Sequence, residues 1–118
     1  MAALDNASAQ TPAACPTGVT LAVAPPTAAA PTTVTVAVTP AQNIKPASAA
    51  DATSFHLHYF IDTPAAAAGT VIPTGDPKIV HGTTTQDLGA LAAGSHTVVA
   101  VLGQLNHTAC DARATVTF

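Results

Sequence analysis

The feature that most constrains this sequence is a strict alternation of apolar and small polar side chains. Val34, Val36 and Val38 alternate with Thr or Ala between residues 33 and 39, and residues 19–23 repeat the pattern. A period of two places successive side chains on opposite faces of an extended chain, so each stretch predicts a half-buried β-strand. Proline follows both stretches and ends them. No stretch shows the three-and-four spacing of an amphipathic helix.

Further strand signals occur at residues 55–62, 70–72, 78–81, 83–88, 97–102 and 114–118, with turn residues between them. We therefore predict an all-β fold, a single immunoglobulin-like Greek-key sandwich of about seven strands. Residues 17–118 form the predicted sandwich, and residues 1–16 form a flexible N-terminal arm. The predicted buried positions lie on the apolar side of the alternating patterns: Val34, Val36, Val38, Leu57, Tyr59, Val99, Val101 and Val116.

The composition excludes several classes of partner. A length of 118 residues suits one domain, and three Phe, one Tyr and no Trp leave it a thin core of Val and Ala. Only three residues are Lys or Arg, too few for the basic patch that binds nucleic acid. No apolar run is long enough to insert into a membrane. Nothing in the composition identifies a protein partner.

Two cysteines, Cys15 and Cys110, lie near opposite ends of the chain. The first and last strands of a sandwich are often neighbours. We therefore predict a disulfide between Cys15 and Cys110, with two free thiols as the alternative. Neither cysteine belongs to a C-x-x-C pair, which argues against a cysteine zinc site. A disulfide favours a periplasmic or secreted protein over a cytosolic one. No signal peptide is visible after Met1, and for an exported protein we expect it to have been removed.

Histidines carry the chemistry of this weakly charged sequence. His56 and His58 lie two apart in the strand predicted at 55–62, so both point to the face opposite the predicted core. Two imidazoles in this H-x-H arrangement can converge on copper, zinc or nickel. His81 ends a short strand and His107 precedes Cys110 in a loop, and either can supply a third ligand. The predicted metal set is therefore His56, His58, His81 and His107, with a copper ion favoured and zinc as the alternative.

His96 has a different predicted role. It follows a Leu-x-x-Gly corner and begins a strand, where sandwiches often place a Tyr that bonds back to the backbone. We predict a structural corner there, with metal binding as the alternative.

Three function classes follow. The favoured one is an exported metal-binding module for copper storage, delivery or sensing. The alternative is a structural or interaction domain of the cell envelope or a secreted assembly, without metal. A copper redox enzyme is disfavoured, because no substrate groove is indicated and the one candidate acid, Asp62, shares the face of His56 and His58 only at the end of the strand. The sequence also contains no G-x-S-x-G motif and no phosphate loop, so we predict that the protein is not an enzyme.

Four segments carry a resemblance: F-H-L-H-Y-F-I-D at 55–62, I-V-H-G at 79–82, L-A-A-G-S-H-T-V at 91–98 and N-H-T at 106–108. Together they resemble an uncharacterised family of small bacterial exported β-sandwich domains, and the resemblance implies histidines at all five positions. The segment at 55–62 is also similar to the strand that supplies two copper ligands in copper-zinc superoxide dismutases. That likeness implies copper ligands at His56 and His58. It implies no activity, since the zinc subsite is missing and the later elements differ in order.

Overall fold

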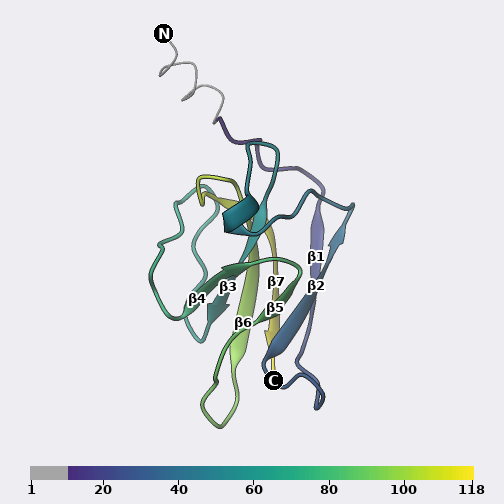
Figure 1. The fold of residues 1–118 in the computed structure, drawn as a ribbon, viewed down its shortest axis with the longest axis vertical. Helices are drawn as coiled ribbons and strands as arrows, with labels where there is room; N and C mark the ends of the chain where they lie inside the picture. The colour runs from purple at the N-terminus through teal and green to yellow at the C-terminus, as the bar shows by residue number, and fades with distance from the viewer. Residues whose placement is uncertain (1–10) are drawn as a thin grey trace.

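The computed structural model describes residues 11–118 as two antiparallel β-sheets packed face to face (Figure 1). One sheet has the order β1-β2-β5, formed by β1 (Thr20–Ala24), β2 (Thr33–Thr39) and β5 (Thr85–Asp87). The other has the order β4-β3-β6-β7, formed by β4 (Ile79–Gly82), β3 (His56–Ile61), β6 (Thr97–Gly103) and β7 (Ala109–Thr117). A single 3-10 turn, η1 (Ala47–Ala49), precedes β3. Seven strands in these two sheets confirm the predicted immunoglobulin-like sandwich.

The main core lies between the two sheets. It is built from Val34, Val36, Phe55, Leu57, Tyr59, Ile61, Leu88, Val98, Ala100, Leu102 and Cys110. The alternating residues of β2 and β3 enter it as the period of two predicts, although Val38 and Val116 are only half-buried. Each fully buried Val or Leu contributes about 1.5–3 kcal/mol to stability.

On β6 the prediction is confirmed for the burial of Val101, which is fully buried, but the predicted residues do not face the main core. Val98, Ala100 and Leu102 point into the main core, whereas Val101 lies on the opposite face and Val99 is only half-buried there. Residues 98–102 are all apolar, so alternation alone does not select a face. The pairing with β3 selects it, because Ala100 lies opposite Tyr59 and so shares its face.

The outer face of the four-stranded sheet is also covered. The loop between β3 and β4, residues 62–78 and hereafter the β3–β4 loop, contributes Ile72, Ala65 and Ala66 to a second apolar cluster with Phe60 and Val101. Within this loop the strand predicted at 70–72 is reduced to a single bridge between Val71 and Thr108. Because the loop lies over this face, all six residues of β3 are buried, including the two histidines.

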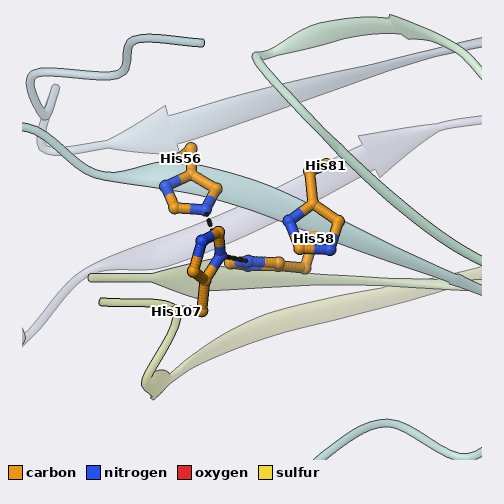
Figure 2. Close-up of side chains that lie close together, drawn as sticks. All are labelled: His56, His58, His81 and His107. Atoms are coloured by element: carbon orange, nitrogen blue, oxygen red, sulfur yellow. Dashed lines mark hydrogen bonds between the residues drawn. The ribbon is translucent and has the colours of Figure 1, made fainter. Parts of the chain in front are cut away.

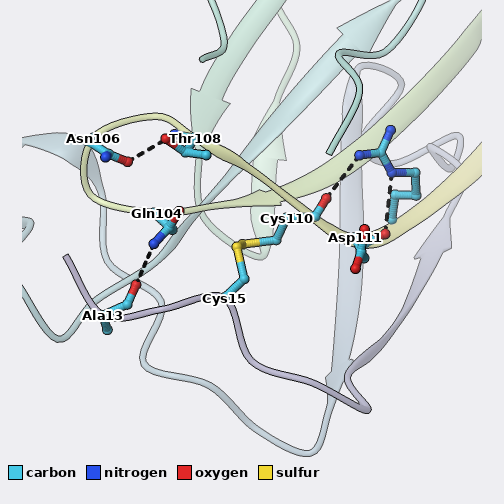
Figure 3. The surroundings of a disulfide bond; sticks show 8 residues. Ala13, Cys15, Gln104, Asn106, Thr108, Cys110 and Asp111 are labelled. Atoms are coloured by element: carbon cyan, nitrogen blue, oxygen red, sulfur yellow. Dashed lines mark hydrogen bonds between the residues drawn. A yellow bond between two sulfur atoms is a disulfide. The ribbon is translucent and has the colours of Figure 1, made fainter. Parts of the chain in front are cut away.

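The disulfide between Cys15 and Cys110 confirms the predicted pairing (Figure 3). The Ala13 amide donates to the Ala52 carbonyl, and the Gln104 side chain donates to the Ala13 carbonyl. Of the predicted arm at 1–16, residues 1–10 lie outside the described part of the chain, and residues 11–16 include these contacts. Within residues 11–118, no helix has the length and apolar character needed to cross a bilayer.

Candidate metal centre

Four histidines from three chain segments meet on the covered outer face of the β4-β3-β6-β7 sheet (Figure 2). His56 and His58 project from β3, and His81 lies on β4 directly opposite His58. His107 belongs to the loop between β6 and β7. One ring nitrogen from each of the four lies within 4.8 Å of the other three. The structure thus brings together both residues that the sequence offered as alternative third ligands.

Three ring nitrogens converge most closely. Nδ1 of His107 lies 3.1 Å from Nε2 of His56 and 3.3 Å from Nε2 of His58. Metal–imidazole bonds of about 2.0–2.1 Å in a tetrahedral site place neighbouring ligand nitrogens roughly 3.3 Å apart. The observed spacings therefore match those of nitrogens that share one ion.

His81 completes the cluster from the neighbouring strand. Its ring centroid lies 4.5 Å from that of His58 and 5.1 Å from that of His107. Nε2 of His81 lies 3.3 Å from the Pro73 carbonyl oxygen, which can only accept a hydrogen bond. This contact places the proton on Nε2 and leaves the Nδ1 lone pair for a ligand. A backbone carbonyl that orients a histidine in this way is common around metal sites.

The pocket is shaped around the His58 ring. Gly103 on β6 lies opposite His56, and a Cβ atom built there would fall 2.6 Å from Nδ1 of His58. His56 and His58 are 1% and 0% exposed, whereas His81 and His107 are half-buried. The half-buried pair therefore forms the side of the cluster nearer to solvent.

Burial favours the neutral, metal-binding form of His56, His58 and His81 by lowering the pKa of each. It lowers the pKa of His56 from 6.5 to about 4, and the neighbouring His107 and His81 lower it further. Burial lowers the pKa of His58 more strongly, and it lowers the pKa of His81 in the same direction. A neutral imidazole is required for coordination, so the site is held ready for a cation at neutral pH.

The arrangement carries two costs for stability. Nδ1 of His56 and Nδ1 of His58 are buried without a hydrogen-bond partner of normal geometry, and each such group costs about 1–3 kcal/mol. His107 adopts a left-handed backbone conformation with φ of 67°, which costs roughly 1–2 kcal/mol for a residue with a Cβ. Hydrogen bonds from the His107 amide to Gln104 and from the Ile72 amide to His107 hold that conformation. Both costs fall on the residues that form the cluster.

His96 lies at the opposite end of β3 from His56, beside Asp62. Its Nδ1 is 2.6 Å from Oδ2 of Asp62, and its Nε2 is 2.6 Å from the carbonyl of Ala92, four residues earlier. Asp62 also accepts a hydrogen bond from the Thr97 amide at 2.8 Å. The Asp62 hydrogen bond, followed by that of Ala92, raises the pKa of His96. An acceptor at each ring nitrogen favours the protonated form of His96, and its bond back to the backbone resembles that of a corner Tyr in other sandwiches.

Sequence reasoning considered Asp62 only as a partner of the strand histidines, and it missed both the contact of Asp62 with His96 and the role of Gly103. The contact between Asp62 and His96 joins residues 34 apart and depends on the strand register. Gly103 ends an apolar strand, which is a common position for glycine and gave no signal of a ring packed above it.

No family model, no curated protein and no solved structure matches this chain. The resemblances noted from the sequence therefore stay predictions. What the site can do follows from its own geometry and chemistry: four neutral imidazoles can hold a metal ion.

Proposed function

We propose that this chain is an exported copper-binding module that stores, delivers or senses the ion. The observation that carries the proposal is the convergence of four imidazole nitrogens within 4.8 Å inside a covered face of the sheet. The affinity of nitrogen sites for divalent first-row metals rises to a maximum at copper, with zinc the nearest competitor.

The costs described above support a functional reading of the cluster. The unpaired Nδ1 atoms of His56 and His58, the left-handed backbone of His107 and a glycine at position 103 within β6 all weaken the apo fold locally. Departures of this kind concentrate at functional sites, because an apolar packing of the same face would be more stable. All of them serve to bring imidazole rings together.

We propose binding without catalysis. The two central histidines are fully buried, and the β3–β4 loop packs over the face that holds them. A catalytic metal needs an open coordination position that a substrate can reach. Storage or delivery requires only that the ion enter and leave.

Export is supported by the disulfide between Cys15 and Cys110, because such bonds persist mainly in oxidising compartments. Alkylation of the protein in intact cells, followed by mass spectrometry, tests this part. Unreacted cysteines support export, and two alkylated cysteines would contradict it.

The metal proposal is tested by titrating the full chain with copper and with zinc, and by elemental analysis after dialysis. We expect one ion per chain, with copper displacing zinc. The double variant His56→Ala/His58→Ala should lose this binding. His96→Gln is the matched control, because it also removes a histidine but leaves the cluster intact. Equal, weak uptake by wild type and the double variant would leave a metal-free structural or interaction domain as the better account.

A further inference from the structure

The charge of the cluster and of its surroundings limits which copper ion the site takes. All four candidate ligands are imidazoles, and a coordinating imidazole is neutral. Bound Cu(II) would therefore leave a net charge of two in the pocket, and bound Cu(I) a charge of one. The cost of moving an ion out of water rises with the square of its charge, so a neutral, buried ligand set favours the ion of lower charge.

Within residues 11–118, no aspartate accepts a hydrogen bond from a cluster histidine. Asp51 pairs with Lys45, Asp62 with His96, and Asp87 with Thr32 and Gly89. The two others, Asp76 and Asp111, are exposed, and Asp76 accepts from the Lys78 amide. Metal-binding histidines usually donate their second N–H to a carboxylate, a carbonyl or water, which raises the basicity of the ligand. Here neither Nδ1 of His56 nor Nδ1 of His58 has a carboxylate partner; the backbone of Val101 is the group closest to a hydrogen bond with His58.

A fixed cation stands on the same face. The register places His81, His58, Val101 and Arg113 in one row across β4, β3, β6 and β7. Residues directly opposite one another share a face, so Arg113 lies two strands from His58 on its side of the sheet. Its guanidinium is held there by the carbonyls of Ala66 and Cys110, each at 2.9 Å. Its positive charge disfavours a divalent ion more than a monovalent one.

We infer that the histidine cluster selects a monovalent ion with a filled d-shell, Cu(I), over Cu(II) and Zn(II). This inference rests on the proposed function, and it names the oxidation state of the copper ion that the site would bind. Such an ion imposes no geometry of its own, and it accepts the arrangement in which Nδ1 of His107 lies 3.1 and 3.3 Å from its neighbours. The inference concerns binding preference and requires no electron transfer by the protein.

The test measures the affinity of the full chain for Cu(I) without oxygen and for Cu(II) in air, each against a competing chelator of known affinity. Every tenfold preference for Cu(I) raises the reduction potential of the bound couple by about 59 mV. We expect a preference of at least about tenfold, and therefore a potential at least about 59 mV above that of the aqueous couple. Ag(I), a monovalent ion that does not change oxidation state, should displace Zn(II) from the site.

Substitutions at Arg113 test the effect of its positive charge on the preference for Cu(I). Arg113→Gln should lower the potential of the bound couple, by raising affinity for Cu(II) roughly severalfold more than for Cu(I). Arg113→Lys keeps the charge and should retain the wild-type potential. A potential at or below that of the aqueous couple, or one that Arg113→Gln leaves unchanged, would overturn the inference while metal binding stood. If the protein bound none of Cu(I), Cu(II), Ag(I) and Zn(II), the proposed function would be overturned as well.

Discussion

The imidazole of His58 occupies the space above Gly103 that a side chain would otherwise fill: a Cβ at residue 103 would lie 2.2 Å from Cε1 of the ring. The two residues belong to neighbouring strands, and the space beside the ring is closed. His58 therefore keeps its position only while residue 103 is glycine.

Gly103→Ala should displace the His58 ring and lower copper affinity by roughly 100-fold or more, because the loss of an outer hydrogen-bond partner alone typically costs about 10–100-fold. The added methyl group should also cost roughly 1–3 kcal/mol of stability through overpacking. Titration and denaturant unfolding measure the two effects. Gly82→Ala is the matched control, because the nearest atoms that its Cβ would meet belong to the flexible side chain of Gln86 and not to a cluster histidine. Wild-type affinity in Gly103→Ala would show that the ring is not a ligand.

Replacing His107 should separate metal binding from stability. Asn tolerates the left-handed backbone that His107 adopts, so His107→Asn should change the unfolding free energy of the apo protein by less than about 1 kcal/mol. Copper affinity should fall more than tenfold, because the nitrogen that lies nearest to both His56 and His58 is removed. His107→Ala should lose the same affinity and about 1 kcal/mol more stability. If His107→Asn bound copper as tightly as wild type, this residue would not be a ligand.

The metal-free protein should lose stability in acid. The pKa of His56 is about 4 in the fold and about 6.5 in the unfolded chain, so the unfolded chain binds more protons between these values. Stability is therefore complete above about pH 6.5 and falls as the pH drops towards 4, by about 3 kcal/mol from His56 alone. The lowered pKa of His58 acts in the same direction. Urea unfolding across this range measures the slope, and it should be shallower in His56→Asn. Equal slopes would contradict the burial effect.

The corner pair should show a different dependence on pH. Asp62 has a lowered pKa and His96 a raised one, so their contribution is complete between the unfolded values, about 3.9 and 6.5. It is lost as the pH falls through the folded pKa of Asp62, and again as the pH rises through the folded pKa of His96. A double-mutant cycle with Asp62→Asn and His96→Gln measures the coupling. We expect copper affinity to stay at the wild-type level in both variants, and a large loss of affinity would place His96 among the ligands.

Removal of the disulfide should weaken both the fold and the site. Cys15 and Cys110 are 95 residues apart, and opening a loop of that length costs up to about 4.7 kcal/mol in the chain-entropy model. Cys110 follows His107 by three residues, so the Cys15→Ser/Cys110→Ser variant should also bind copper more weakly. The comparison is made under conditions in which both proteins remain folded. Unchanged affinity there would show that the His107 loop is held without the disulfide.

Local patterns predicted the strands more reliably than the contacts between them. Alternation placed Val34 and Val36 in the core and put His56 and His58 on one face, because side-chain direction in a strand depends only on position along the chain. The choice between His81 and His107 stayed open, since both depend on how distant segments pair. The core face of β6 was wrong for the same reason: residues 98–102 are apolar on both sides.

Local sequence patterns also could not predict that the histidine cluster is buried. It depends on the β3–β4 loop, whose small residues gave only a weak strand signal at 70–72. That signal corresponds to the bridge from Val71 to Thr108, and the amide of Ile72 donates to the carbonyl of His107. Such pairing links segments that are more than thirty residues apart, so no periodicity along the chain shows it.

The same pairing affects the rates at which an ion could bind to the cluster and be released from it. The β3–β4 loop is tied to the segment that carries His107 by the Gly69 and Ile72 amides, which donate to Ala109 and His107, and by the Ala109 amide, which donates to Thr70. A ligand and its cover thus form one unit that must separate before an ion can leave the two buried imidazoles. For a bound ion, opening of this unit would include breaking the bond to His107, so the rate of local opening would limit the residence time together with the strength of that bond.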